Sequence, residues 1–132
     1  MTEPQLHGQS LQASLTVKDL EKSVAWFTGA LGFAVSRRIE RDGQLRAVAV
    51  EAGNVRLLLN KDDGAKGWDR TKGDGMSFQI TTDQEVDAIA KRITNYGWAL
   101  DTEPQDMPWG ARAFRVRDPD GFRWVVSRAL TV

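Results

Sequence analysis

The feature that most constrains the fold of this chain is an internal repeat. Gly32-Phe33-Ala34-Val35 corresponds to Gly97-Trp98-Ala99-Leu100, 65 positions further along, and the same offset pairs Leu15 with Ile80. Self-similarity at a fixed spacing predicts two copies of one structural module, each of about 55 residues. Because a module of this size cannot bury a whole sheet face alone, we expect the two copies to pack together or to exchange with a second chain.

The first copy has the pattern of a strand, a helix and three further strands. Residues 11–17 alternate between apolar and polar side chains, which is typical of a half-buried strand. Asp19 suits a helix N-cap and Gly32 suits a C-terminal stop, which predicts a helix within 19–33. Turn sequences at 41–43 and 52–54 separate three more expected strands, over residues 34–40, 45–52 and 55–60.

The second copy repeats this order after a break. Residues 61–74 are rich in glycine and charge without periodicity, so we expect a linker loop. Beyond it, the pattern predicts a strand, an amphipathic helix and three strands, over 76–81, 83–97, 98–104, 111–117 and 122–127. The predicted fold class is therefore α+β, with two βαβββ modules over residues 11–60 and 75–128. The polar leader over residues 1–10 is expected to be disordered or loosely ordered.

Composition disfavours several classes of function. The 18 basic and 18 acidic residues balance, so a charge footprint for nucleic acid or for an anionic membrane surface is not expected. Cysteine is absent, which excludes disulfides and thiolate chemistry, and the one histidine, His7, lies in the leader. No stretch has the length of a membrane span or the pattern of a signal peptide. We therefore expect a cytoplasmic protein without nucleic-acid or membrane partners.

A site is expected on the sheet faces that the helices leave open. Each helix should cover the apolar face of its own sheet, so that the other faces look into a shared cup. Such a concave surface with a few polar groups is the usual place for a ligand. The alternative is that these polar residues simply face solvent. The residues expected there are Gln12, Ser14, Thr16, Ser77 and Gln79.

Three stretches resemble the vicinal oxygen chelate superfamily, which includes glyoxalase I, extradiol dioxygenases, fosfomycin resistance enzymes and bleomycin resistance proteins. They are "VKDLEKSVAWFTGALGF", "NYGWAL" and "PWGARAFRVRDPDGFRW", and the resemblance extends from about Leu11 to Ser127. It implies paired βαβββ modules that form curled mixed sheets, and a homodimer in which the cups are often completed across the subunit interface. The bleomycin-resistance branch is the most similar.

Enzymes of this superfamily hold a metal ion with up to four ligands on strands that face the cup. The resemblance places these positions at Gln12, at about Leu58, near Gly75 or Ser77, and at Val125. One amide oxygen is too few protein ligands for a divalent ion, so we expect neither a metal nor another cofactor. The alternative is a metal-dependent lyase or dioxygenase, similar to glyoxalase I, that uses Gln12 and unrecognised carboxylates.

Two tryptophans in loops are candidate ligand contacts. The resemblance to the bleomycin-resistance branch implies that Trp68 and Trp109 line a groove and stack on a flat or cationic molecule. Arg38 and Arg112 are the accompanying polar candidates. Alternatively, the tryptophans cover a dimer seam and the arginines are solvated strand residues.

The expected function is therefore binding. We expect a metal-free, bleomycin-resistance-like protein that binds or sequesters a small aromatic or amphipathic molecule in an aromatic-lined groove. Since the chain is neutral and the loop over 61–74 is rich in lysine and arginine, a neutral or anionic ligand is favoured. A third possibility is a regulatory or protein-interaction module with a vestigial groove.

Overall fold

The computed structural model describes residues 5–130 and confirms the two βαβββ modules. Residues 6–12 of the expected leader contain no helix or strand, and residues 1–4 lie outside the described part. The first module consists of β1 (Ala13–Val17), α1 (Leu20–Gly29), β2 (Ala34–Arg41), β3 (Gln44–Ala52) and β4 (Val55–Lys61). The second consists of β5 (Phe78–Thr81), α2 (Val86–Asn95), β6 (Thr102–Met107), β7 (Ala111–Arg117) and β8 (Arg123–Ala129).

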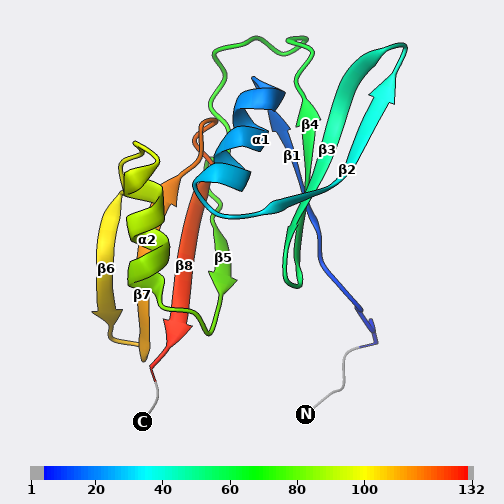
Figure 1. Cartoon of the computed structure of the whole chain (residues 1–132). Helices are drawn as coiled ribbons and strands as arrows, with labels where there is room; N and C mark the ends of the chain where they lie inside the picture. The colour runs from blue at the N-terminus through cyan, green and yellow to red at the C-terminus, as the bar shows by residue number, and fades with distance from the viewer. Residues whose placement is uncertain (1–4, 131–132) are drawn as a thin grey trace.

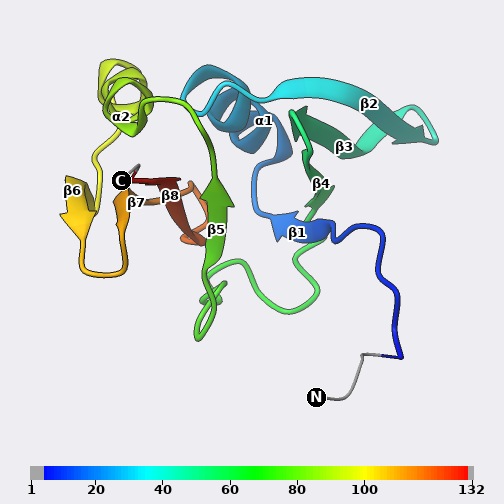
Figure 2. The same ribbon diagram turned by 90° about the horizontal axis from the view of Figure 1, so that it is seen from below.

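The two modules form separate mixed sheets of the same topology (Figure 1). The strand orders are β1-β4-β3-β2 and β5-β8-β7-β6. In each sheet the first strand of the module runs parallel to the last, and the other neighbours are antiparallel. This arrangement leaves β1 and β5 as edge strands, and they face each other where the two sheets meet (Figures 1 and 2).

Both helices lie on the same side of the two sheets, where they share one hydrophobic core (Figure 2). The α1 residues Trp26 and Phe27 are buried and reach into the second module. Trp26 packs edge-on against Trp98 with ring centroids 5.8 Å apart, and Phe27 packs against Trp124 at 5.6 Å. Because these aromatic contacts cross from one repeat to the other, the modules are held together by their core.

Side chains satisfy backbone groups at both ends of α1. The Lys22 amide donates to Asp19 Oδ1 at 3.1 Å, which confirms Asp19 as the N-cap of α1. At the other end, α1 has no basic residue in its last turn. Instead, Arg92 of α2 donates to the carbonyl oxygens of Gly29 and Thr28 at 3.1 and 3.3 Å. A cation at a helix C-terminus is favourable, so this contact also couples the modules.

Three predicted strands begin two or more residues later than expected: β1 and β5 each start two residues late, and β6 differs most. The strand expected over 98–104 starts at Thr102, because Trp98 is used for packing and its Nε1 donates to Arg117 O at 2.7 Å. Pro104 lies within β6, where it is tolerated because β6 is an edge strand. Within residues 5–130, neither helix has the length and apolar character needed to cross a membrane.

Candidate ligand-binding cleft

A cleft of about 890 Å³ lies between the facing edge strands β1 and β5. The five polar residues expected to face a shared cup all line it, namely Gln12, Ser14, Thr16, Ser77 and Gln79. Its apolar lining includes Leu57 of β4, Met76 before β5, and Phe78 and Ile80 of β5. The structure thus brings these five residues to one cleft, between the edge strands of the two sheets.

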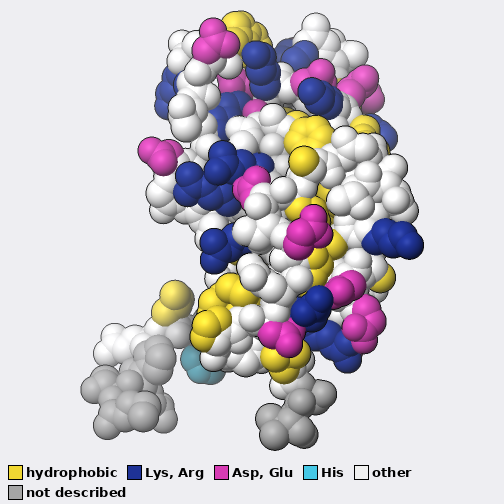
Figure 3. Space-filling view, turned by 90° about the vertical axis from the view of Figure 1, so that its left-hand side faces the viewer, with side chains coloured by type: hydrophobic (Ala, Val, Ile, Leu, Met, Phe, Trp, Pro, Cys, Tyr) yellow, Lys and Arg dark blue, Asp and Glu magenta, His cyan; other side chains and the backbone are white. Residues whose placement is uncertain are grey.

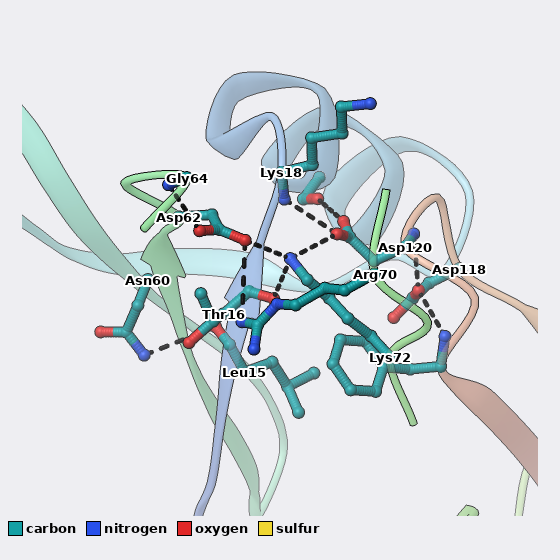
Figure 4. A network of polar contacts seen from close by, with 12 residues as sticks. Leu15, Thr16, Lys18, Asn60, Asp62, Gly64, Arg70, Lys72, Asp118 and Asp120 are labelled. Atoms are coloured by element: carbon teal, nitrogen blue, oxygen red, sulfur yellow. Dashed lines mark hydrogen bonds and ion pairs between the residues drawn. The ribbon is translucent and has the colours of Figure 1, made fainter. Parts of the chain in front are cut away.

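The loop between β4 and β5 closes one side of this cleft and is fixed by a buried lysine. The Lys72 side chain is only 8% exposed, and its ammonium lies within contact of three oxygen atoms (Figure 4). They are Thr16 O at 3.0 Å, Asp62 Oδ2 at 2.9 Å and Asp120 Oδ2 at 3.2 Å. Lys72 therefore ties the loop to β1, to the end of β4 and to the turn before β8.

The two carboxylates of this network have different further partners. Asp62 accepts a hydrogen bond from the Gly64 amide at 2.9 Å, and the Lys72 ammonium, the largest influence, holds the pKa of Asp62 below its usual value. Asp120 accepts from the Lys18 amide at 2.8 Å and from the Ser23 hydroxyl at 3.4 Å. Asp120 thus connects the second module to the start of α1 in the first.

Asp120 belongs to the Asp-Pro-Asp-Gly turn, whose first residue is also buried. Asp118 Oδ1 accepts from the Phe122 and Asp120 amides, each at 3.0 Å, and its Oδ2 accepts from Trp124 Nε1 at 3.1 Å. Burial is the largest influence on this group and raises the pKa of Asp118 to about 6, although the three donors act in the opposite direction. The turn serves to fix Trp124 in the core and Asp120 on the first module.

The four positions that hold metal ligands in superfamily enzymes do not fit a metal here. Leu58 lies beside Ser14 in the first sheet, and Val125 lies beside Gln79 in the second. With Gln12 and Ser77, these positions offer amides and hydroxyls but neither imidazole nor carboxylate. Across the described part of the chain, no three His, Cys, Asp or Glu side chains form a group able to hold a metal ion.

The structure does not bring the five predicted ligand residues together. Gln12 alone lines the β1–β5 cleft. Trp68 is 49% exposed and lies in a separate, smaller cleft of about 670 Å³ with Lys18 and Leu20. Its ring packs closely on Gly64, whose φ of 75° and lack of a Cβ permit the contact. Trp109 is 61% exposed in the β6–β7 turn and lines neither of these two clefts.

The two predicted arginines lie on the helix-covered faces of their sheets. Arg38 is directly opposite Val48, a core residue, and directly opposed residues share a face. Arg112 donates to both oxygens of Asp87 at 2.7 and 3.0 Å and to Asp106 at 3.0 Å. These carboxylates raise the pKa of Arg112, and Arg112 lowers that of Asp87. Its guanidinium is therefore already occupied by acidic partners.

Three cationic side chains line the cleft: Arg56 of β4, and Arg70 and Lys72 of the following loop. The sequence placed a basic loop beside the expected groove, and its residues Arg70 and Lys72 do border the cleft. Neither was predicted as a direct ligand contact, and Arg56 was not predicted at the site. For Arg112 a signal was present: it alternates with Phe114 and Val116 in the sequence of β7, which places it on the core face.

Comparison with known proteins agrees with this architecture. Residues 9–126 match the sequence profile of the Glyoxalase/Bleomycin resistance protein/Dioxygenase superfamily. The chain belongs to this superfamily. Among solved structures, TioX from Micromonospora sp. ML1 has a TM-score of 0.75 and 24% identity, with 93% of this chain and 100% of that one covered. A superfamily member from Sphaerobacter thermophilus has a TM-score of 0.70 and 26% identity, with 90% and 97% covered.

A relative in Mycobacterium tuberculosis extends the comparison at the sequence level. The uncharacterized protein Rv0887c of strain H37Rv is 28% identical over 127 residues, which cover 92% of this chain and 75% of that protein. As a member of the glyoxalase/bleomycin resistance superfamily, this chain keeps the paired modules. At the family's metal positions, it carries the residues described above, which are poor metal ligands.

Proposed function

We propose that this superfamily member binds a small amphipathic molecule in the β1–β5 cleft. The observation that supports this most directly is the cleft itself, whose volume of about 890 Å³ lies within the range of about 300–1,000 Å³ typical of small-molecule sites. Exposed amides and hydroxyls, including Gln12 and Gln79, stand beside an apolar lining that includes Met76 and Phe78. Binding by such a surface needs no catalytic group.

A homodimer is part of the same proposal. Trp109 is exposed, and the hydrogen bond from the Leu130 amide to Gly110 O at 2.9 Å places a second exposed apolar residue beside the same turn. Figure 3 shows apolar side chains exposed toward the lower end of the molecule, the end where the β6–β7 turn lies in Figure 1. A second copy of the chain that covers this turn would explain why the turn carries an exposed tryptophan side chain.

The proposal is tested with N-phenylnaphthylamine, an uncharged probe that becomes fluorescent in apolar sites. We expect saturable binding with one probe per chain. Gln79→Trp, which fills the cleft from β5, should abolish binding. Gln105→Trp adds the same bulk to the exposed surface of β6 and should leave binding unchanged. Absence of binding by the unmodified protein, or equal loss in the two variants, would contradict a site in this cleft.

A further inference from the structure

The charged side chains that line the β1–β5 cleft are all of one sign. Arg56, Arg70 and Lys72 line it, whereas no aspartate or glutamate does so within residues 5–130. The whole chain is neutral, so this is a local separation of charge. The nearby carboxylates, Asp62 and Asp120, have side chains only 5% exposed, because they are buried against Lys72. A molecule entering the cleft therefore meets cationic donors and no anionic oxygens.

Of the three cationic side chains, that of Arg70 is the one whose N–H donors are available to a ligand. The ammonium of Lys72 already lies within contact of three oxygen atoms. Arg70 has a single ion-pair partner, Asp62 Oδ2 at 3.7 Å, which is too long for a hydrogen bond. Its side chain is 34% exposed, and none of the hydrogen bonds within residues 5–130 involves its guanidinium. Arg56 is more exposed and only 4.0 Å from Glu51, so it contributes a weaker, screened charge.

We infer that the ligand is an organic anion, a carboxylate or sulfonate carried on an apolar body, with Arg70 as its main polar contact. This inference rests on the proposed function and adds the charge of the ligand to it. The planar guanidinium offers paired N–H donors that match the two oxygens of such an anion. Lys72 holds the loop that presents Arg70, as Figure 4 shows. The apolar residues Met76, Phe78 and Ile80 are available for the body of the ligand.

The test compares two probes that share one ring system. Anilinonaphthalene sulfonate carries a sulfonate, and N-phenylnaphthylamine is its uncharged counterpart. We expect Arg70→Gln to weaken binding of the sulfonate by about tenfold, the size of a lost charge-assisted hydrogen bond, and to leave the uncharged probe unaffected. The matched control is Arg46→Gln, since Arg46 is an exposed arginine of β3 outside the cleft. It should change neither affinity.

The outcomes separate the inference from the proposal on which it rests. If Arg70→Gln has no effect on the sulfonate, or weakens both probes equally, Arg70 does not bind the anion and the inference is wrong, while a cleft that binds the uncharged probe remains. If neither probe binds the unmodified protein, the proposed function itself fails. Raising the salt concentration should weaken the sulfonate alone, and equal salt sensitivity of both probes would also count against the inference.

Discussion

Two buried carboxylates, those of Asp118 and Asp120, hold the turn before β8 in its place in the fold. Asp118 is 4% exposed and receives three hydrogen bonds from its own turn and from Trp124. The Asp-Pro-Asp-Gly sequence is strong turn chemistry by itself. Its acidic residues do more than form the turn, since Asp118 orients a core indole and Asp120 bonds to the first module. Such roles depend on partners distant in sequence, and no residue pattern reveals them.

Asp118 should make stability depend on pH in a defined direction. Its pKa in the folded protein is about 6, above the ordinary value of 3.8, so the folded state binds the proton more tightly than the unfolded state does. Its stabilising contribution is complete below the ordinary value and is lost as the pH rises through about 6. Asp118→Asn cannot take up this proton. The difference in free energy of unfolding between wild type and variant should therefore grow by about 1–3 kcal/mol as the pH falls from about 7 to about 4.

Urea unfolding at both pH values measures this difference. Even at neutral pH the variant should be less stable by about 1–3 kcal/mol, because an amide group replaces one acceptor oxygen and sets two donors against each other. Asp74→Asn, at an exposed loop position, controls for the loss of one carboxylate. A difference between Asp118→Asn and wild type that stays constant with pH would show that burial does not govern this carboxyl.

At the scale of elements, the loop between β4 and β5 is the part that differs most from its sequence pattern. Its glycines and charges indicate a linker, yet Lys72 bonds to three separate segments. A lysine is buried only when its charge is matched, and here Asp62 and Asp120 match it. The loop is therefore a fixed wall of the cleft.

Replacing Lys72 should loosen the loop between β4 and β5. Lys72→Met leaves two buried carboxylates close together with no ammonium between them, so we expect a lower midpoint of urea unfolding. We also expect trypsin to cut faster after Lys66 and Arg70 in the loosened loop. Lys91→Met, at an exposed position of α2, should change neither property. Unchanged trypsin sites and rates in Lys72→Met would mean that other contacts hold the loop.

The sequence predicted the helices and strands best where the hydrophobic period and the capping residues indicated the same element. Asp19 and the apolar spacing located α1, and alternation located β1 and β5, because these patterns are local consequences of backbone geometry. The strand expected from Trp98 was misplaced because its apolar residues are used against α1. The cleft residues on β1 and β5 followed from the repeat, and the basic loop that contains Arg70 was expected beside them. The contacts of that loop with β1 and with the turn before β8 were not predicted, because a loop without periodicity carries no information about its neighbours.

At the scale of the whole molecule, the proposed homodimer rests mainly on the exposed side chain of Trp109. Trp109 lies in the β6–β7 turn and does not line the cleft that contains Trp68. Trp109→Ala should leave the fold intact and shift a dimer toward monomer, as measured by sedimentation velocity, because exposed indoles are frequent anchors of interfaces. The control Val35→Ala removes exposed apolar surface from β2, an edge strand of the other sheet. A monomeric wild type, or a dimer equally sensitive to both changes, would contradict this role.

The sequence by itself determined the number of modules, their βαβββ order and the polar strands that meet at the cleft. Repeats, alternation and helix caps are patterns in the residue sequence itself, so they can be recognised without any knowledge of the fold. Only the tertiary structure decided that the modules share one core through Trp26, that Arg112 is paired with acidic side chains, and that Lys72 holds Arg70 at the cleft. These features join residues far apart in the chain, and their free energy arises from burial and charge pairing that exist only once the chain has folded.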